Sequence, residues 1–492
     1  MTHDDTLSRT GQTEPDPVDA DPAHLPLVVD LDGTLLRTDS LHEALLALVS
    51  ARPADVLRLP GWISTGRAGL KAELAERTPP PGDTLPLNDD VVALVGAARE
   101  NGRRTALVSA ADQRQVDAVA KATGLFDEAW GSTPQRNLKG AEKARFLTDR
   151  FGEKGFDYAG DSHVDLPVWQ AARHAITVGA GTALRRAASD ANPDIRHLAP
   201  PDGPARARSA LRAMRPHQWS KNLLLFLPAL AAHSLDAVFS LILAFIAFCL
   251  AASSVYIVND LLDLAADRAH ARKRKRPFAA GDLTPAFGVA LAAVLLLAAL
   301  IFALAVGGAF LGVLLVYLVI TFAYSVWLKR KLLVDVLTLA GLYTVRIVAG
   351  GVAVSVPLSP WLLGFSIFLF LCLAAVKRQA ELVDLMASGR SAAGRAYAPD
   401  DLPVLRGIAI TASQATVLVL ALYIASEEVQ ALYPDPWILW GICPLLLYWA
   451  LRMVMKAHRG LMTDDPIVFA ASDRVSLVLI IACASLALAA AL

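Results

Sequence analysis

The pattern of apolar and polar positions divides the chain into two regions. In the first, short apolar runs at residues 25–29 and 105–108, and a third that ends at Tyr158–Ala159, are separated by stretches with helical patterns. A short apolar run before polar residues is typical of a buried strand, and strands alternating with helices favour a parallel sheet. The pattern therefore predicts an α/β domain over residues 26–195, preceded by a polar tail at residues 1–25 that we expect to be disordered.

In the second region, long apolar runs replace the short ones. Most of them approach the roughly 20 residues that a helix needs to cross a bilayer. The runs span residues 219–233, 236–258, 285–305, 308–327, 333–354, 360–376, 404–425, 434–451 and 474–491. The first is short enough to be re-entrant. We expect a proline-containing linker at residues 196–208, then an all-α bundle of about nine transmembrane helices over residues 209–492.

Composition and charge sharpen this division. The chain has 492 residues, of which 55% are hydrophobic and 19% are charged, whereas soluble domains are about 45–50% apolar and about 25% charged. These values exclude a disordered chain and argue against a simple soluble enzyme. The formal net charge of zero combines an acidic first region with a basic second one. The four cysteines lie inside apolar runs, so we expect them to pack as small apolar residues.

Basic residues fall in alternate loops of the second region. These loops are Arg268–Arg276, Lys329–Lys331, Lys377–Arg395 and Arg452–Arg459. Because positively charged loops stay on the cytoplasmic side, this pattern predicts the orientation of the bundle. The chain also begins without the basic and apolar segments of a signal peptide. We therefore expect a multi-pass protein of the inner (plasma) membrane, with the first domain and the polar loops in the cytoplasm.

Candidate chemistry in the first region follows the predicted strands. Asp30-Leu31-Asp32-Gly33-Thr34 follows the first strand, Ser109 follows the second, and Gly160-Asp161-Ser162-x-x-Asp165 follows the third. Lys143 begins a helical segment between the last two. Open α/β sheets bind ligands at the carboxyl ends of their strands, so these groups are expected at one site.

This set of motifs resembles the haloacid dehalogenase superfamily of phosphohydrolases. The resemblance implies that Asp30 is a nucleophile that forms an aspartyl-phosphate and that Asp32 is the general acid and base. It also implies that Ser109 and Lys143 hold the phosphoryl oxygens, with Lys139 as the alternative lysine. Asp30, Asp32, Asp161 and Asp165 are the expected Mg²⁺ site. Residues 40–95 would form a cap. The alternative is a degenerate domain that only binds or regulates.

The second predicted membrane span is followed by a row of charged residues. Its polar members are Asn259, Asp260, Asp263, Asp267, His270, Lys273 and Arg276. The spacing of the three carboxylates predicts one helix face, where they would repel each other unless a cation lay between them. Ionisable groups at a membrane helix end are functional candidates. The alternative, an ordinary cytoplasmic loop, explains the basic residues but not the acidic row.

This row resembles the UbiA superfamily of intramembrane transferases. The resemblance implies that Asp260, Asp263 and Asp267 are catalytic, bind Mg²⁺, and assist the departure of a diphosphate. Asn259, His270, Lys273 and Arg276 would contact the substrate.

Three further segments favour one branch of this superfamily, the decaprenyl-phosphate phosphoribosyltransferases. They are residues 215–222, residues 346–351 and residues 377–384. This branch implies phosphoribosyl pyrophosphate as donor and a polyprenyl phosphate as acceptor. The expected ligands of these phosphorylated substrates are Lys221, Arg346, Lys377, Arg378 and Glu381.

Alternatives to these ligand roles stay open. A structural ion pair of Arg346 with Asp335 is one, and a membrane-face anchor for Lys377 and Arg378 is another. Asp464, Asp465 and Asp473 are expected in a solvated loop.

The two regions suggest consecutive reactions on one lipid. The transfer product keeps a 5-phosphate, which the first domain could remove to give a lipid-linked ribose that feeds arabinan synthesis in the cell wall. The main alternative is an aromatic prenyltransferase that uses a polyprenyl diphosphate. Another is a lipid-phosphate binding or transport protein with a regulatory domain. No nucleic-acid partner is expected.

Overall fold

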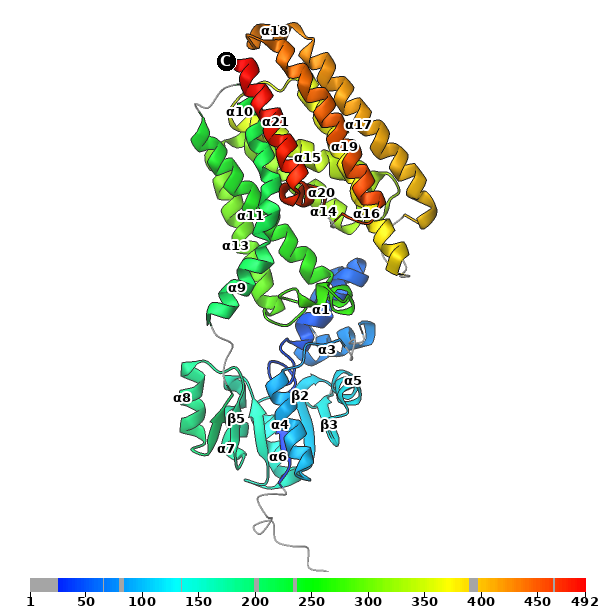
Figure 1. Ribbon diagram of the computed structural model, residues 1–492. Helices are drawn as coiled ribbons and strands as arrows, with labels where there is room; N and C mark the ends of the chain where they lie inside the picture. The colour runs from blue at the N-terminus through cyan, green and yellow to red at the C-terminus, as the bar shows by residue number, and fades with distance from the viewer. Residues whose placement is uncertain are drawn as a thin grey trace, which may run out of the picture. The chain divides into compact units, whose positions relative to one another are not determined.

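The computed structural model divides into two compact units. Unit 1 comprises Met1–Ala213 and Asp260–Val289, and unit 2 comprises Met214–Asn259 and Ala290–Leu492. The structure describes residues 25–64, 66–78, 84–133, 135–198, 203–232, 237–388, 397–462 and 465–492. Nearly all of the tail expected at residues 1–25 therefore lies outside the described residues. Figure 1 labels the helices and strands.

Unit 1 contains a six-stranded parallel sheet, so the predicted α/β fold is confirmed. The strands are β1 (Leu27–Val29), β2 (Thr105–Asp112), β3 (Glu128–Ser132), β4 (Asp157–Gly160), β5 (Ala175–Thr177) and β6 (Ile195–His197). Their order in the sheet is β3-β2-β1-β4-β5-β6. Val29 of β1 lies opposite Leu107 of β2 on one side and Ala159 of β4 on the other. The central strand is thus flanked by the other two strands that the apolar pattern predicted.

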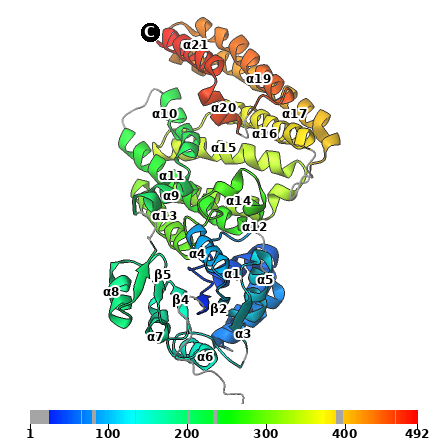
Figure 2. The same cartoon turned by 60° about the horizontal axis from the view of Figure 1, so that its bottom comes forward.

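Helices cover both faces of this sheet (Figure 2). Leu27 and Val29 pack with α4 (Asp89–Glu100) and α5 (Gln113–Thr123) on one face, whereas Val28 packs with α6 (Ala141–Phe151) and α7 (Leu166–Ala171) on the other. This alternation follows from the two-residue repeat of a strand and explains why β1 is apolar throughout. The helices of unit 1 are α1 (Ser40–Ala51), η3 (Pro53–Arg58), α2 (Leu59–Ser64), α3 (Gly66–Arg77), α4 (Asp89–Glu100), α5 (Gln113–Thr123), α6 (Ala141–Phe151), η4 (His163–Asp165), α7 (Leu166–Ala171), α8 (Thr182–Ala191), α9 (Gly203–Met214), α12 (Leu264–Ala269) and η6 (Lys273–Lys275).

Two predicted boundaries in unit 1 differ from the structure. The expected cap at residues 40–95 is shorter, because α4 begins at Asp89 and packs Val91 and Val95 into the sheet core. The segment from Ser40 to Arg77 is the part that lies outside the layers of the sheet, and we call it the cap. The expected linker at residues 196–208 is partly regular structure, since β6 extends to His197 and α9 begins at Gly203.

Eight helices of the chain are long and apolar enough to cross a membrane, among the residues that the structure describes. The long helices are α11 (Val238–Leu262), α13 (Pro285–Val306), α14 (Gly308–Val326), α15 (Val334–Ala353), α16 (Pro360–Ser388), α17 (Leu402–Ile424), α19 (Ile442–His458) and α21 (Arg474–Ala491). The shorter ones are η5 (Pro216–Phe226), α10 (Leu227–Ala231), η7 (Leu328–Arg330), η8 (Pro399–Asp401), α18 (Glu427–Leu432), η9 (Pro436–Gly441) and α20 (Pro466–Ser472). The predicted all-α polytopic architecture is confirmed.

The first expected span, at residues 219–233, forms no long helix. It is divided into the 3₁₀ helix η5 and the five-residue α10. Pro216 and Pro228 lie at the starts of these two pieces, and proline lacks the N–H that would continue a preceding helix. The approximate count of nine spans therefore becomes eight long helices and a broken segment.

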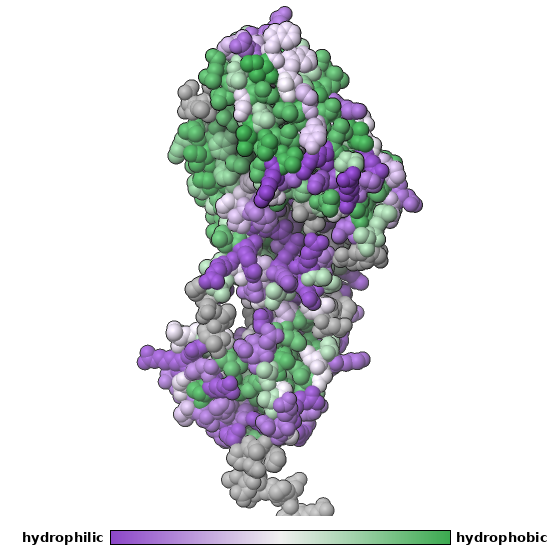
Figure 3. Space-filling view, in the orientation of Figure 1, coloured by the Kyte–Doolittle hydropathy of each residue, from purple (hydrophilic) through white to green (hydrophobic). Residues whose placement is uncertain are grey.

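The outer surface of unit 2 suits contact with lipid. Large apolar side chains are exposed along its long helices, including Phe239, Ile301, Phe322 and Ile481. Hydrophobic residues dominate this surface in Figure 3. An apolar surface of this extent is costly in water and typical of a membrane-embedded bundle.

Candidate active sites

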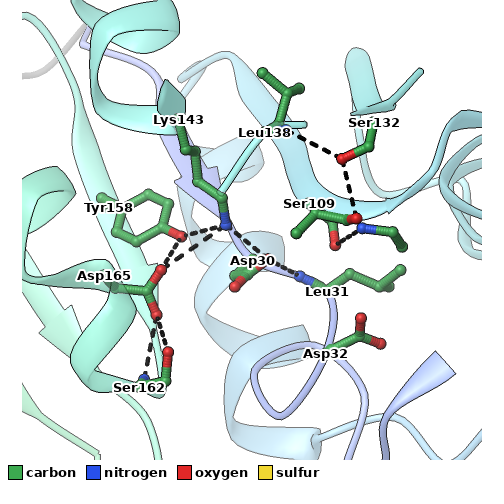
Figure 4. Close-up of polar contacts among 12 residues, drawn as sticks. Asp30, Leu31, Asp32, Ser109, Ser132, Leu138, Lys143, Tyr158, Ser162 and Asp165 are labelled. Carbon is green, nitrogen blue, oxygen red and sulfur yellow. Dashed lines mark hydrogen bonds and ion pairs between the residues drawn. The ribbon is translucent and has the colours of Figure 1, made fainter. Parts of the chain in front are cut away.

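The first candidate site lies at the carboxyl ends of β1, β2 and β4. Asp30 directly follows β1, Ser109 lies near the end of β2, and Asp161 directly follows β4. Because these strands are adjacent and parallel, their ends meet at one edge of the sheet. Figure 4 shows Asp30, Ser109, Lys143 and Asp165 gathered there.

A close backbone approach at Gly33 shapes this edge. Gly33 has φ +72°, and a Cβ atom on it would lie 2.1 Å from Oδ2 of Asp161. Both the backbone conformation and the available space therefore require glycine. The loop after β1 and the loop after β4 are held against each other at this point.

Lys143 is buried at the centre of the site. Its Nζ lies 3.0 Å from Oδ1 of Asp30 and 3.8 Å from Oδ1 of Asp165, and it donates to the hydroxyl of Tyr158 at 2.9 Å. Burial lowers the pKa of Lys143, but the two carboxylates outweigh burial and raise it. The lysine is therefore a fixed cation beside Asp30.

The alternative lysine lies elsewhere in the site. Lys139 is exposed in the loop before α6, whereas Lys143 is among the most deeply buried side chains of the domain. Ser109 is also buried, and its Oγ accepts from the N–H of Ala111 at 3.0 Å. Tyr158 was not predicted as a site residue, since its position inside an apolar strand gives the pattern of a core residue.

Three carboxylates form a candidate metal site. One oxygen from each of Asp30, Asp161 and Asp165 lies within 4.8 Å of the others. Burial raises the pKa of Asp161 to about 8, with further contributions from the charges of Asp30 and Asp165. Tyr158 and Ser162 donate to the two oxygens of Asp165 and fix its place. Crowded carboxylates of this kind fit a hard divalent cation such as Mg²⁺.

Asp32, which was predicted as a metal ligand as well as an acid, is not in this group of three. Its Oδ1 accepts from the N–H of Ser40 at 2.7 Å and its Oδ2 from the Ser40 hydroxyl at 3.0 Å. Burial, followed by the charge of Asp39, raises the pKa of Asp32 to about 7. A carboxyl group with this pKa can donate and accept a proton near neutral pH.

The helical structure of the acidic row after the second span differs from the predicted one. The helix α11 ends at Leu262, and Asp263 separates it from α12, so the three carboxylates do not share one helix face. Arg276 Nη1 instead lies between two of them, at 3.1 Å from Asp260 Oδ1 and 2.6 Å from Asp267 Oδ2. Burial raises the pKa of Asp267 in spite of the guanidinium. An arginine of the same segment thus lies between Asp260 and Asp267, and the metal cation expected within the row stays a prediction.

The other predicted members of this segment are less enclosed. Asn259 and Asp263 are half-buried, and Lys273 is exposed. His270 accepts at Nδ1 from the backbone N–H of Arg272 at 3.2 Å and of Lys273 at 3.4 Å. These contacts shape the loop.

Arg346 is a buried cation within unit 2. Its Nε donates to Asn222 Oδ1 at 2.9 Å and its Nη2 to the Tyr317 hydroxyl at 3.0 Å. The guanidinium also lies over the rings of Tyr317 and Tyr343. The predicted alternative, an ion pair with Asp335, is wrong: the salt bridges of the described residues include none with Arg346, and Asp335 pairs with Arg378.

Arg378 is held by three acidic or phenolic partners. It donates to both oxygens of Asp335, to Glu381 and to the hydroxyl of Tyr324. It is almost fully buried, so it is not an anchor at the membrane face. Arg378 and Glu381, both predicted as substrate ligands, neutralise charge within the fold.

Asp465 was predicted in a solvated loop, but it is largely enclosed and pairs with Lys221. Burial raises its pKa, yet the charges of Lys221 and Lys377 outweigh burial and lower it. Its Oδ1 also accepts from the N–H groups of Ile467 and Val468 at the start of α20. Asp464 lies outside the described residues, and Asp473 pairs with Arg452. Lys221 and Lys377 thus form a second cationic region in unit 2.

Comparisons with known proteins agree with this division of the chain. The model of the UbiA prenyltransferase family matches residues 223–467, and that of the haloacid dehalogenase-like hydrolases matches residues 27–170. The uncharacterized protein y4nM of Sinorhizobium fredii is 40% identical over 92% of this chain and 88% of its own length. The nodulation protein NoeC of Azorhizobium caulinodans is 36% identical over 55% of this chain and 89% of its own length.

A third relative has a name that states an activity. The decaprenyl-phosphate phosphoribosyltransferase of Corynebacterium glutamicum is 32% identical over 56% of this chain and 84% of its own length. Together with the eight apolar helices and the parallel sheet, these matches identify both halves. The chain is a multi-pass membrane enzyme that belongs to the UbiA prenyltransferase family and carries a haloacid dehalogenase-like hydrolase domain at its amino-terminal side.

Proposed function

We propose that the UbiA-family region of the chain transfers 5-phosphoribose from phosphoribosyl pyrophosphate to a polyprenyl phosphate. An oxygen of the lipid phosphate forms the new bond to the anomeric carbon. The bond from that carbon to pyrophosphate breaks, and pyrophosphate leaves with the electron pair. The relative from Corynebacterium glutamicum is named for this activity, which supports the assignment.

The cations of unit 2 suit substrates with several phosphate groups. Arg346 is buried and makes no salt bridge among the described residues, so an anionic substrate would compensate its charge. Lys221 and Lys377 supply two further positive charges near Asp465. A prenyl diphosphate with an aromatic acceptor would bring fewer phosphate groups to these cations, which favours the phosphoribosyl reaction over aromatic prenylation.

The acidic row has the composition of a metal-dependent leaving-group site. Asp260, Asp263 and Asp267 would hold Mg²⁺, which stabilises negative charge on a departing diphosphate when it is bound. Arg276 already pairs with two of these carboxylates and compensates one of their two negative charges. It is placed to contact the diphosphate as well, since a guanidinium binds phosphate oxygens in the same way as carboxylate oxygens.

We further propose that unit 1 removes the 5-phosphate of the transfer product. Asp30 attacks phosphorus, and the ester oxygen leaves with a proton from Asp32. Water then cleaves the aspartyl-phosphate with Asp32 as the base, which releases inorganic phosphate. Lys143 stabilises the transferred phosphoryl group, while Asp30, Asp161 and Asp165 would hold Mg²⁺. The products are phosphate and a lipid-linked ribose.

The observation that carries the phosphatase proposal is the buried Lys143 beside both Asp30 and Asp165. A domain that only binds or regulates has no need to bury a lysine at the end of a strand between two carboxylates, because burying these charges costs free energy. The pKa of Asp32 near 7 adds a proton donor and acceptor on the neighbouring loop.

The test is a product analysis with the purified full-length protein in lipid nanodiscs. Phosphoribosyl pyrophosphate, decaprenyl phosphate and Mg²⁺ are supplied, and the lipid products are identified by mass spectrometry. The wild type is expected to form decaprenylphosphoryl ribose. Asp30→Asn is expected to accumulate the product that still carries the 5-phosphate, and Asp260→Ala is expected to form neither lipid.

Two control variants test whether these effects are specific to the site residues or follow from the loss of any carboxylate. Asp149→Asn removes an exposed carboxylate of unit 1, and Asp435→Asn removes an exposed carboxylate of unit 2. Both are expected to give the wild-type product. A dephosphorylated product from Asp30→Asn would contradict the phosphatase role, and normal transfer by Asp260→Ala would contradict the role of the acidic row.

A further inference from the structure

Lys71 brings a positive charge from the cap to the phosphatase site. It lies in α3, and its Nζ donates to the carbonyl of Ala110, next to Ser109 near the end of β2. No sequence motif marks this lysine, and the roles assigned to Asp30, Asp32 and Lys143 do not use it. It makes no salt bridge among the residues that the structure describes.

The charges that act on Lys71 locate it within the site. Burial lowers the pKa of Lys71, and among the charges that act on this pKa that of Asp32 contributes most, followed by Asp39, Lys139 and Asp30. Lys71 therefore interacts more strongly with the charge of Asp32, the proton donor, than with that of Asp30, the nucleophile. Lys139, which is exposed on the loop before α6, adds a second positive charge in the same neighbourhood.

The position relative to Asp32 sets the side of the substrate that Lys71 meets. Asp32 protonates the oxygen that leaves, so groups beside it face the leaving alcohol. The transferred phosphoryl group already has its own cation in Lys143, which lies 3.0 Å from Asp30. Hydrolysis of a simple phosphate ester therefore does not require a second lysine beside Asp32.

We propose that Lys71 forms a leaving-group subsite that binds a second anion on the substrate, with the chemistry of a phosphodiester. This inference rests on the proposed phosphatase function and specifies its substrate class. The product of the transferase reaction has this chemistry, because its ribose carries a 5-phosphate and a phosphodiester at the anomeric carbon. A phosphate monoester without a second anion lacks the group that Lys71 binds.

The experiment compares two soluble probes that differ in this second anion. One is ribose 5-phosphate with a methyl phosphodiester at the anomeric carbon, and the other is methyl ribofuranoside 5-phosphate. Release of phosphate by the full-length protein in Mg²⁺ gives kcat and KM for each. A charge-assisted contact predicts that the wild type prefers the first probe in kcat/KM by about tenfold or more, mainly through KM.

Three variants test whether Lys71 causes this preference. Lys71→Gln is expected to bring the ratio of kcat/KM between the probes close to one, and Lys71→Arg is expected to restore most of it. Lys121→Gln, at an exposed position of α5, is expected to keep the wild-type ratio. A change in the ratio is a readout that a merely structural tether between α3 and Ala110 would not produce.

Two outcomes would contradict the subsite alone, and a third would contradict the phosphatase assignment as well. Equal losses on both probes in Lys71→Gln would make Lys71 a tether of the cap and overturn the subsite. A wild type that does not distinguish the probes would overturn it as well. A wild type that releases phosphate from neither probe would overturn the phosphatase assignment itself, and the subsite with it.

Discussion

At the scale of single residues, buried charge dominates both candidate sites. Asp161 lies beside Asp30 and Asp165, and Arg378 lies between Asp335 and Glu381. In the first case like charges are crowded together, and in the second opposite charges are paired. The two arrangements are expected to respond differently to pH, to metal ions and to substitution, because like charges oppose ionisation in the first and opposite charges compensate each other in the second.

The pKa of Asp161 predicts a pH-dependent effect of Mg²⁺ on stability. In the metal-free protein burial keeps Asp161 protonated up to about pH 8, whereas in the unfolded chain it ionises near its ordinary pKa of 3.8, so the fold loses stability as the pH rises between these two values. Mg²⁺ binds the ionised form. The rise in Tm that Mg²⁺ produces should therefore be larger at about pH 9 than at about pH 6.

Thermal unfolding of the full-length protein, with Mg²⁺ or with a chelator, measures this effect. Asp161→Asn removes a ligand of the candidate metal site at the sheet and leaves the acidic row after α11 intact, so this variant should lose most of the pH-dependent part of the Mg²⁺ effect. If the difference between the wild type and Asp161→Asn is the same at both pH values, the metal site is wrongly assigned.

The Arg378–Asp335 pair predicts a large effect on stability. Both side chains are almost fully buried, and removing one partner leaves the other charge without compensation, which typically costs about 3–5 kcal/mol. Asp335→Asn should therefore lower the Tm of the detergent-solubilised protein strongly. Asp89→Asn, which breaks the solvent-exposed pair with Arg37, should change it little. Similar changes in the two variants would show that Arg378 finds another partner.

The sequence predicted the site residues that follow strands, but it did not predict ion pairs between residues that are far apart along the chain. Asp30, Ser109 and Asp161 follow from the rule that parallel strands present ligands at their carboxyl ends. The partners of Arg378 and Lys221 are Asp335 and Asp465, far away along the chain. Periodicity carries no information on such pairs, because it describes only neighbours within one element.

At the scale of secondary-structure elements, the loops at the strand ends carry the candidate catalytic residues. Two glycines allow this to be tested, since Gly33 and Gly124 have similar positive φ values of +72° and +60°. A Cβ atom at Gly33 would collide with Asp161, whereas one at Gly124, at the end of α5, would meet open space.

Gly33→Ala should therefore abolish phosphate release, and Gly124→Ala should only lower stability by about 1 kcal/mol through left-handed backbone strain. Phosphatase assays and thermal unfolding of both variants distinguish the two effects. Activity of Gly33→Ala close to that of Gly124→Ala would mean that the loop after β1 can move away from Asp161 without loss of function.

Element boundaries were predicted less well where charge and packing compete with the apolar pattern. The helix carrying Asp260 was expected to continue through Asp267, but it ends at Leu262. The break allows Arg276 to reach both Asp260 and Asp267. In the first domain, α4 was assigned to the cap because a helical pattern does not show which layer a helix joins.

At the scale of the whole molecule, the distribution of basic loops predicts a single orientation in the membrane. The segment around Arg274 should face the cytoplasm, and the turn around Asp435 should face outward. Single cysteines at these exposed positions, in a background without the four native cysteines, can be treated with a membrane-impermeant thiol reagent in spheroplasts. Asp435→Cys should react in intact spheroplasts, and Arg274→Cys only after permeabilisation.

The reverse pattern of labelling would invert the topology. It would also place the phosphatase domain and the basic loops outside the cell, away from a cytoplasmic supply of phosphoribosyl pyrophosphate. Both proposed reactions would still take place on one side of the membrane, but the transfer step would lack its cytoplasmic donor. The same experiment thus tests the orientation and the plausibility of the combined pathway.

The hydrogen bonds between Asp32 and Ser40 have a consequence for how this enzyme can diversify. Ser40 is the first residue of α1, so Asp32, the proposed proton donor, is bound to the start of the cap rather than to its later helices. Sequence changes further along the cap, in α2 and α3, can alter which alcohol is accepted while this junction keeps the acid in place. New substrate preferences are therefore accessible without rebuilding the hydrolytic machinery, provided that the short turn from Asp32 to Ser40 keeps its length.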